Sequence, residues 1–149
     1  MVISGFHELK SRLREAEPVR AVVAAAHDRH TLEAVFQAQA DGLISPILVG
    51  DVEKIWAIAR KLDCETDPEA LVEAGDEESC ARTSVALIRQ GRGQALVKGM
   101  LQTGTLLKAA VQPDTGIRAS RLLSHVAILD VPAYHKLMFV SDGGMVVAP

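Results

Sequence analysis

The fold of this chain is decided by residues 19–50, which read VRAVVAAAHDRHTLEAVFQAQADGLISPILVG. Residues 19–26 form an apolar run whose length and β-branched content favour a buried strand. Asp28 then stands where it can cap a helix whose apolar residues recur at helical spacing. Residues 44–50 return as a second apolar run. A strand, a helix and a strand in this order predict two parallel strands joined by a right-handed crossover.

Strands and helices alternate along the rest of the chain. Helical spacing follows Asp51 over residues 52–62 and recurs over residues 76–89 and 105–111, whereas residues 69–74 are ambiguous between strand and helix. Further strands are predicted at residues 95–97, 122–129 and 136–140, the last two joined by a turn. The pattern predicts a single α/β domain over residues 1–149, with a three-layer, mostly parallel sheet, helices on both faces, and a β-hairpin near the C-terminus.

The composition limits the possible partners. Of the 149 residues, 48% are hydrophobic and only 3% are aromatic, so the core must be built from Ala, Val, Leu and Ile. The net charge of −3 and the lack of a long Lys/Arg run argue against nucleic acid, whose binding needs a concentrated basic face. No segment resembles a signal peptide or a membrane span, which predicts a cytoplasmic protein with no membrane partner. Cys64 and Cys80 lack the spacing of a zinc site and are predicted to be reduced thiols.

Residues 97–108, VKGMLQTGTLLK, form the most informative polar motif. A buried strand ends at Lys98-Gly99, small hydroxyl residues follow in a loop, and a helix starts close behind. In such a unit the free backbone N–H groups and the positive end of the helix dipole point where a phosphate would sit. Countercharge is available from Lys98, Lys108, Arg118 and Arg121. The motif therefore predicts a site for an anion.

Each of these residues also has a purely structural interpretation. Lys98 at a strand end is equally typical of a solvated surface lysine, although the glycine after it favours a role in ligand binding. Thr103 and Thr105 fit helix capping as well as they fit ligand binding. Arg118 and Arg121 fit solvated loop charges as well as they fit an anion site.

A second polar cluster lies within and after the last predicted strands. Ser124 and His125 interrupt an apolar run in which alternation would bury one of them, and a hydrogen-bonded core or interface histidine is the commoner outcome. Asp142 follows an apolar strand, a frequent place both for a functional carboxylate and for a cap. Nearer the N-terminus, the cluster of His27, Asp28 and His30 lacks a third ligand with metal spacing, and helix capping by the aspartate explains it, so no metal is predicted.

Several stretches together carry a family resemblance. They are SPILVG at 45–50, LVKGMLQT at 96–103, and above all RLLSHVAILDVP at 121–132 with Ser141-Asp142 and Ala148-Pro149. In this order, and spread over nearly the whole chain, they resemble the phosphate acetyl/butyryltransferase family, with the butyryl branch the closer match. The resemblance covers only the first half of a typical member.

The resemblance implies a two-domain α/β enzyme, usually a dimer, that exchanges coenzyme A and inorganic phosphate on a short acyl group. It implies acyl-CoA and phosphate as small-molecule substrates, no tightly bound cofactor, and a second domain that is absent from this chain. The family's catalytic Ser, Arg and Asp group lies in that second half, so no catalytic residue is assigned. Lys108 stands where the family commonly has Arg. The residues expected to bind substrate or phosphate are Lys98, Gly99, Thr103, Lys108, Arg118, Ser124, His125 and Asp142.

Two hypotheses about function remain open from the sequence. The first is an incomplete N-terminal portion of a phosphate acyltransferase, and the second is a non-catalytic α/β domain for anion binding or subunit association. A nucleotide-binding dehydrogenase is disfavoured because no G-x-G-x-x-G follows the first strand. The apolar, Gly-rich residues 141–149 predict either one domain of a longer polypeptide or completion by a second chain.

Overall fold

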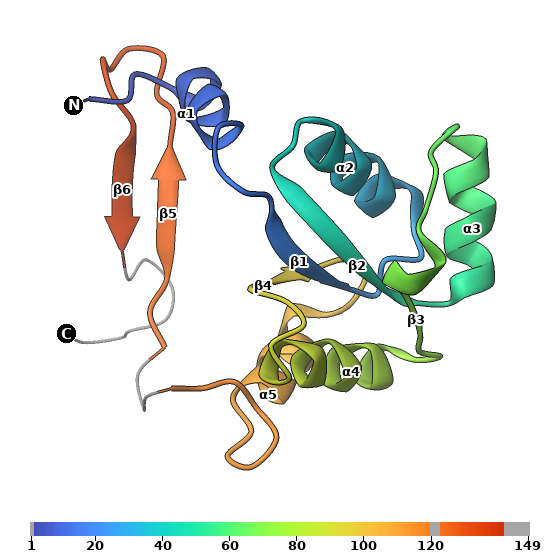
Figure 1. The fold of residues 1–149 in the computed structure, drawn as a ribbon. Coiled ribbons are helices and arrows are strands. Elements are labelled where there is room, and N and C mark those ends of the chain that lie inside the picture. Colours follow the sequence, from blue (N-terminus) through green and yellow to red (C-terminus); the bar gives the residue numbers. More distant parts are fainter. Residues whose placement is uncertain (1, 120–122, 142–149) are drawn as a thin grey trace. The chain divides into compact units, whose positions relative to one another are not determined.

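The computed structural model describes residues 2–119 and 123–141 and divides the chain into two compact units (Figure 1). The central unit runs from Glu17 to Arg118. The terminal unit combines Met1–Ala16 with Ala119–Pro149. Within the described residues, no helix is long and apolar enough to cross a membrane.

The central unit is built on a parallel sheet of four strands. They are β1 (Val19–Ala24), β2 (Ile44–Gly50), β3 (Leu71–Glu73) and β4 (Ala95–Lys98). Their order in the sheet is β3-β2-β1-β4. The register pairs β1 with β2 from Val19 opposite Ile44 to Ala24 opposite Val49. On its other side β1 pairs with β4.

Helices cover both faces of this sheet, as the sequence predicts (Figure 1). Figure 1 shows α2 (Arg29–Ala40) and α3 (Val52–Lys61) on one face, with α4 (Glu77–Arg89) and α5 (Thr103–Ala110) on the other. Each face has its own core. Side chains of Val23, Leu32, Leu48 and Ile55 belong to the core under α2 and α3, whereas Val22 and Leu106 belong to the core under α4 and α5. The three-layer α/β architecture is therefore confirmed.

Aspartate caps explain where three of the helices begin. The Asp28 carboxylate accepts from Thr31 N at 3.0 Å, and Asp51 accepts from Lys54 N at 3.0 Å. Asp76 accepts from Ser79 N at 2.7 Å while Ser79 Oγ accepts from Asp76 N at 3.0 Å, which completes a capping box. The backbone hydrogen bonds at Asp51 and Asp76 lower the pKa of both carboxyl groups. The predicted caps at Asp28 and Asp51 are confirmed.

The ambiguous segment at 69–74 divides between two kinds of structure. A short 3-10 helix spans Pro68–Ala70, and β3 follows it directly. Leu71 and Val72 become strand because they pair in parallel with Leu48 and Val49 of β2. This outcome depends on a neighbour that is distant in sequence, which periodicity alone does not report.

The terminal unit contains α1 (Phe6–Leu13) and an antiparallel hairpin of β5 (Val126–Leu129) and β6 (Met138–Ser141). The predicted hairpin is confirmed, but the strand predicted at 122–129 starts only at Val126. In the described residues β6 ends opposite that position, at Ser141, so Ser124 and His125 lie outside the ladder. Both side chains are exposed. The expectation that alternation would bury one of them is wrong, because the strand that would impose alternation does not include them.

Candidate anion site at the carboxyl edge of the sheet

The strand order places a topological switch point between the carboxyl ends of β1 and β4. The chain passes from β1 outward through β2 to β3 and then returns to the opposite side of β1 as β4. In open α/β sheets such a switch point is the usual place for a ligand. Two hydrogen bonds tie the loop after β4 to the end of β1, namely Gly99 N to Ala24 O at 2.8 Å and Met100 N to Ala25 O at 2.9 Å.

Gly99 allows this close approach because it has no side chain. A Cβ atom at this position would lie 2.4 Å from Ala25 O and 2.7 Å from Ala24 O. Ala25 itself has a φ of 55°, a left-handed conformation that is uncommon outside glycine. The backbone is thus constrained on both β1 and β4 at the switch point, and the loop that follows Lys98 is held in place.

Lys98 is the last residue of β4, and its ammonium folds over the following loop. Its Nζ atom donates to Gly99 O at 3.2 Å and to Leu101 O at 3.1 Å. An ammonium carries three N–H donors, so one remains available. Within the described residues Lys98 forms no ion pair. Lys98 therefore supplies a positive charge near the switch point that no ion pair among the described residues neutralises.

The start of α5 supplies backbone donors next to this charge. Gln102 is the N-cap residue and makes no side-chain capping bond, so neither Thr103 nor Thr105 acts as the cap. The N–H groups of Thr103 and Gly104 have no acceptor in the described part of the chain. Such free donors at a helix start favour an anion. A carboxylate already lies nearby, because Glu77 Oε2 accepts from Gln102 N at 3.1 Å.

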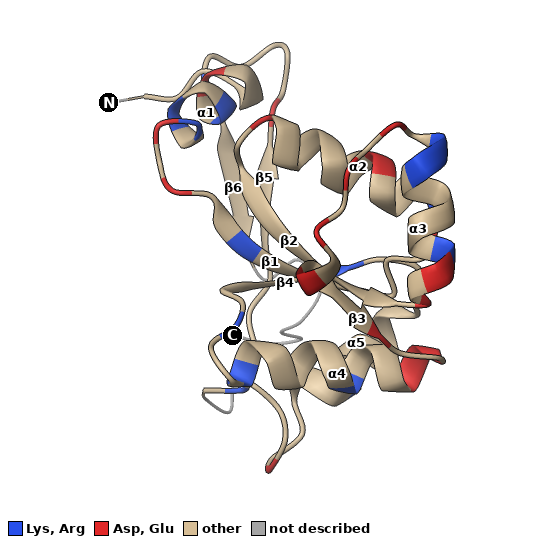
Figure 2. Ribbon diagram, turned by 45° about the vertical axis from the view of Figure 1, so that its right-hand side comes forward, with Lys and Arg blue, Asp and Glu red and all other residues tan. Residues whose placement is uncertain are grey.

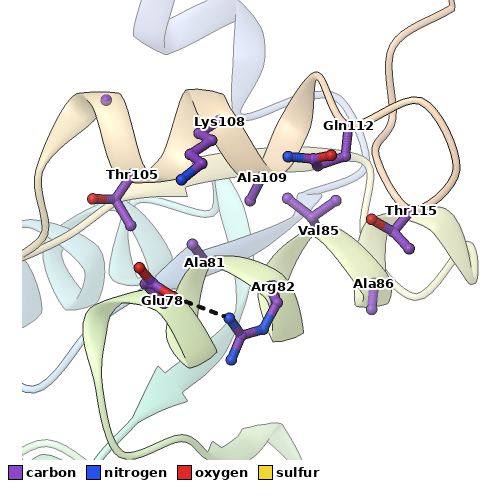
Figure 3. A pocket seen from close by; sticks show the side chains of 11 residues that line it. Glu78, Ala81, Arg82, Val85, Ala86, Thr105, Lys108, Ala109, Gln112 and Thr115 are labelled. Carbon is purple, nitrogen blue, oxygen red and sulfur yellow. Dashed lines mark hydrogen bonds and ion pairs between the residues drawn. The ribbon is translucent and has the colours of Figure 1, made fainter.

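A pocket of about 570 Å³ lies between α4 and α5 (Figure 3). Figure 3 shows Lys108 on α5 facing Glu78 and Arg82 on α4, with Ala81 and Ala109 between them. Glu78 and Arg82 form an ion pair at 3.4 Å, whereas Lys108 forms none within the described residues. An apolar lining with a few polar groups and an uncompensated cation is typical of a site for a ligand with both apolar and anionic parts. The remaining lining residues are Val85, Ala86, Gly104, Thr105, Gln112 and Thr115.

Of the residues predicted from the sequence, Lys98, Gly99 and Thr103 follow one another on β4, the loop after it and the start of α5. Lys108 instead lines the pocket between α4 and α5, whose lining includes none of these three. Arg118 is exposed at the last position of the central unit. Ser124 and His125 are exposed in the terminal unit, and their part in binding substrate or phosphate stays a prediction. Asp142 and Arg121 lie outside the described residues.

Sequence reasoning missed the acidic residues of this region. Glu77 and Glu78 lie at the start of α4, which is red in Figure 2. The spacing of Glu78 and Arg82 indicates a helical ion pair, but nothing in the sequence places that pair opposite Lys108. His27 was considered only as a metal ligand, and its Nδ1 instead accepts from Asp51 N at 3.3 Å. No group of three or more potential metal ligands occurs among the described residues.

The chain is similar along almost its whole length to phosphate acyltransferases. It is 33% identical to phosphate butyryltransferase of Clostridium beijerinckii over 144 residues, which are 97% of this chain and 48% of that protein. It is also 33% identical to phosphate acetyltransferase of Rhizobium meliloti over 146 residues, 98% of this chain and 46% of that protein. The chain thus spans about half the length of the curated relatives it matches. No family model matches the sequence.

Solved structures agree with these relatives. The crystal structure of a branched-chain phosphotransacylase from Enterococcus faecalis superimposes with a TM-score of 0.66 at 27% identity. That match covers 88% of this chain and 45% of the other. The family resemblance predicted from the sequence is confirmed, and it again extends over about half of the related protein.

Proposed function

We propose that this chain, which resembles phosphate butyryl- and acetyltransferases along its length, is the N-terminal portion of a phosphate acyltransferase. The reaction converts an acyl-CoA and inorganic phosphate into an acyl phosphate and free coenzyme A. A short acyl group such as butyryl is the proposed substrate. The observation that carries this proposal is the polar segment after β4, where the Lys98 ammonium donates to two loop carbonyl oxygens and the N–H groups of Thr103 and Gly104 have no acceptor among the described residues.

The reaction requires that two anionic reactants be brought together and that both be held in one geometry. The loop after β4 is suited to meet part of these requirements. A phosphate oxygen forms a bond to the thioester carbonyl carbon, the carbon–sulfur bond then breaks, and coenzyme A leaves as its thiolate, which takes up a proton. Phosphate and coenzyme A are both anionic, so bringing them together requires cations and N–H donors. Holding both reactants in one geometry supplies much of the rate. We assign phosphate to the Lys98 loop, with Gly99 permitting close approach of the backbone.

The pocket between α4 and α5 is assigned to part of the acyl-CoA. Its apolar lining suits the hydrocarbon portions of the thioester, and Lys108 supplies a point charge for an anionic group. Arg118, Ser124, His125 and Asp142 complete the proposed set of binding residues. Groups that protonate the thiolate are not assigned to this chain, and we place them in the half that the relatives carry in addition.

The proposal includes a cytoplasmic location and a homodimer. Cys64 and Cys80 are free cysteines, as expected in a reducing compartment. The dimer rests on the family resemblance alone, and sedimentation of the complete enzyme measures it. No tightly bound cofactor is proposed.

The test compares the chain with an extended form. The extension joins residue 149 to the part of the Clostridium beijerinckii phosphate butyryltransferase that follows the matched segment. Thiol release is measured in phosphate buffer with acetyl-, propionyl- and butyryl-CoA. We expect release from the extended form and little from the chain alone. Replacing Lys98 with Met in the extended form should raise the KM for phosphate at least tenfold, because a charge-assisted hydrogen bond contributes about 1.5–3 kcal/mol.

The same experiment decides between the two hypotheses of function. An extended form that is folded, binds phosphate and releases no thiol with any of the three substrates would contradict the transferase assignment. It would instead support a non-catalytic anion-binding or association domain.

A further inference from the structure

The pocket between α4 and α5 carries its charged groups toward one end and neutral side chains at the other. Figure 3 shows Thr105 and Glu78 at one end, and Gln112 and Thr115 at the other. An ion pair of 3.4 Å holds the Arg82 guanidinium toward Glu78. The floor between the two ends is hydrocarbon and is formed by Ala81, Val85 and Ala109.

The charged end coincides with the start of α5. Gly104 lines the pocket, and its N–H group has no acceptor among the described residues. Lys108 follows one helical turn later. Because helical side chains lean toward the N-terminus of their helix, its ammonium is directed to this end (Figure 3). The polar head of a ligand would therefore meet a free backbone donor and a positive charge here.

The pocket is longer than a butyryl group. Glu78 and Ala86 both line it and lie about two turns of α4 apart, which at a rise of about 1.5 Å per residue is about 12 Å. A butyryl group contains three carbon–carbon bonds of about 1.5 Å each and spans less than about 5 Å. An octanoyl group contains seven such bonds, spans less than about 11 Å and still fits.

The volume of the pocket agrees with this length. It is about 570 Å³, within the range of about 300–1,000 Å³ that is usual for ligand pockets. A Cβ atom added at Gly104 would have no described atom within 4 Å, so the charged end is open. The small residues that leave the space free are Ala81, Ala86, Gly104 and Ala109.

The hydrocarbon floor favours an acyl chain over the pantetheine arm of coenzyme A. That arm carries amide groups, and the side chains of Ala81, Val85 and Ala109 offer them no hydrogen-bond partner. Burying an amide without a hydrogen bond is costly. An acyl chain has no polar group beyond its carbonyl, so it can lie along the floor with the carbonyl at the charged end.

From these observations we infer that the pocket binds the acyl chain of the thioester, with the reacting carbonyl at the Gly104 end, and that Ala86 and Ala109 limit the length of the chain. Figure 3 shows Ala109 midway along the pocket and Ala86 toward its neutral end. The inference rests on the proposed function for the reaction and adds no chemical step to it. It extends the substrate class from butyryl to straight acyl groups of up to about eight carbons.

The kinetic test measures thiol release by the extended form with acetyl-, butyryl-, hexanoyl- and octanoyl-CoA in phosphate buffer. Each additional buried methylene should raise kcat/KM about fourfold. Hexanoyl-CoA should therefore exceed butyryl-CoA by about tenfold. A kcat/KM that falls steadily from butyryl- to octanoyl-CoA would overturn the inference.

Leucine variants test the two positions that are expected to limit chain length. Ala109→Leu fills the middle of the pocket and should lower the kcat/KM ratio of hexanoyl- to acetyl-CoA at least tenfold, because a hydrophobic pocket discriminates by about this factor for one misfitting methylene. Ala86→Leu fills only the neutral end and should lower the ratio of octanoyl- to hexanoyl-CoA by a similar factor. A ratio does not depend on the fraction of enzyme that is folded, so it reports fit rather than stability.

The matched control is Ala57→Leu on α3. Ala57 is exposed, and α3 covers the opposite face of the sheet (Figure 1). This variant should leave all the ratios unchanged. Ratios that are the same in Ala109→Leu, Ala86→Leu and Ala57→Leu would contradict the assignment of the pocket to the acyl chain.

A binding test on the full 149-residue chain does not depend on catalysis. The probe is octanoate, whose carboxylate takes the place of the thioester carbonyl. We expect octanoate to shift the NMR signals of amides in α4 and α5 and to leave those of α2 and α3 in place. Such shifts without thiol release by the extended form would refute the proposed function and leave the pocket assignment intact. Thiol release without octanoate shifts in α4 and α5 would overturn the pocket assignment and leave the proposed function intact.

Discussion

Replacing Gly99 with Ala tests the close approach of the loop after β4 to the end of β1 most directly. The added Cβ would lie 2.4 Å from Ala25 O and 2.7 Å from Ala24 O, whereas an ordinary carbon–oxygen contact is about 3.3 Å or longer. Both obstacles are backbone atoms and cannot rotate aside. The loop must therefore move by several tenths of an ångström or more.

The cost follows from what this movement disrupts. Overpacking in a tight interior costs about 1–3 kcal/mol. The displacement also stretches the hydrogen bonds from Gly99 N to Ala24 O and from Met100 N to Ala25 O, which are 2.8 and 2.9 Å long. Each contributes about 1 kcal/mol. We expect the free energy of unfolding to fall by about 2–5 kcal/mol in total.

Gly104→Ala is the matched control. A Cβ at Gly104 meets no atom within 4 Å, and the residue lies within α5. Alanine is favoured over glycine in a helix by about 1 kcal/mol, so this variant should be as stable as the wild type or slightly more stable. Urea unfolding followed by far-UV circular dichroism measures both. A Gly99→Ala variant within about 0.5 kcal/mol of the wild type, or an equal loss in Gly104→Ala, would refute the reasoning, since that difference is within the range of ordinary surface substitutions.

Three further predictions concern other parts of the molecule. Ser84 is fully buried in α4, and its Oγ has no hydrogen-bond partner among the described residues. Ser84→Ala should therefore raise the free energy of unfolding, measured by urea titration, by about 1 kcal/mol. A lower free energy of unfolding in the variant would contradict this. Hydrogen bonds from Ser79 lower the pKa of Asp76, so its stabilising contribution is present above the ordinary value of 3.8 and is lost as the pH falls below it. The urea midpoint should therefore drop less between pH 5 and pH 3 in Asp76→Asn than in the wild type. Equal drops in the two proteins would contradict a stabilising role of the ionised Asp76 carboxylate. In the extended enzyme, Lys108→Met should raise the KM for acyl-CoA about tenfold and Lys108→Arg should not, and unchanged KM values in both would remove Lys108 from the binding site.

The sequence predicted the central unit well because its signals are local. The run at residues 44–50 is largely apolar and coincides with β2. Asp28 and Asp51 mark helix starts, because each carboxylate accepts a hydrogen bond from the backbone N–H group only three residues further along the chain. Where a signal depended on a distant neighbour, prediction was weaker. The segment at 69–74 became strand only through pairing with β2, and the pocket between α4 and α5 exists only because two separate helices pack together.

In the candidate site, too, residues with a local sequence signal were predictable and those that depend on a distant neighbour were not. The Lys98-Gly99 pair was recognisable because a strand end followed by glycine is a local pattern, and the structure adds the reason, which is the approach to Ala24 and Ala25. Glu77 was not recognisable, because its bond to Gln102 N joins residues 25 positions apart. The sequence predicts a strand through Ser124 because apolar residues flank it on both sides, yet such flanking residues do not specify where the partner strand ends.

The two units of the chain differ in how their apolar strands are covered. Apolar runs at residues 19–26 and at 126–129 both predict strands that need cover on both faces, and both are strands in the structure. The first run is followed by helices whose apolar faces cover it, and residues 21–26 are almost fully buried. The second is followed by no described helix, and Val126, Ile128 and Leu129 are exposed. A sequence pattern thus specifies the demand for burial but not the element that meets it.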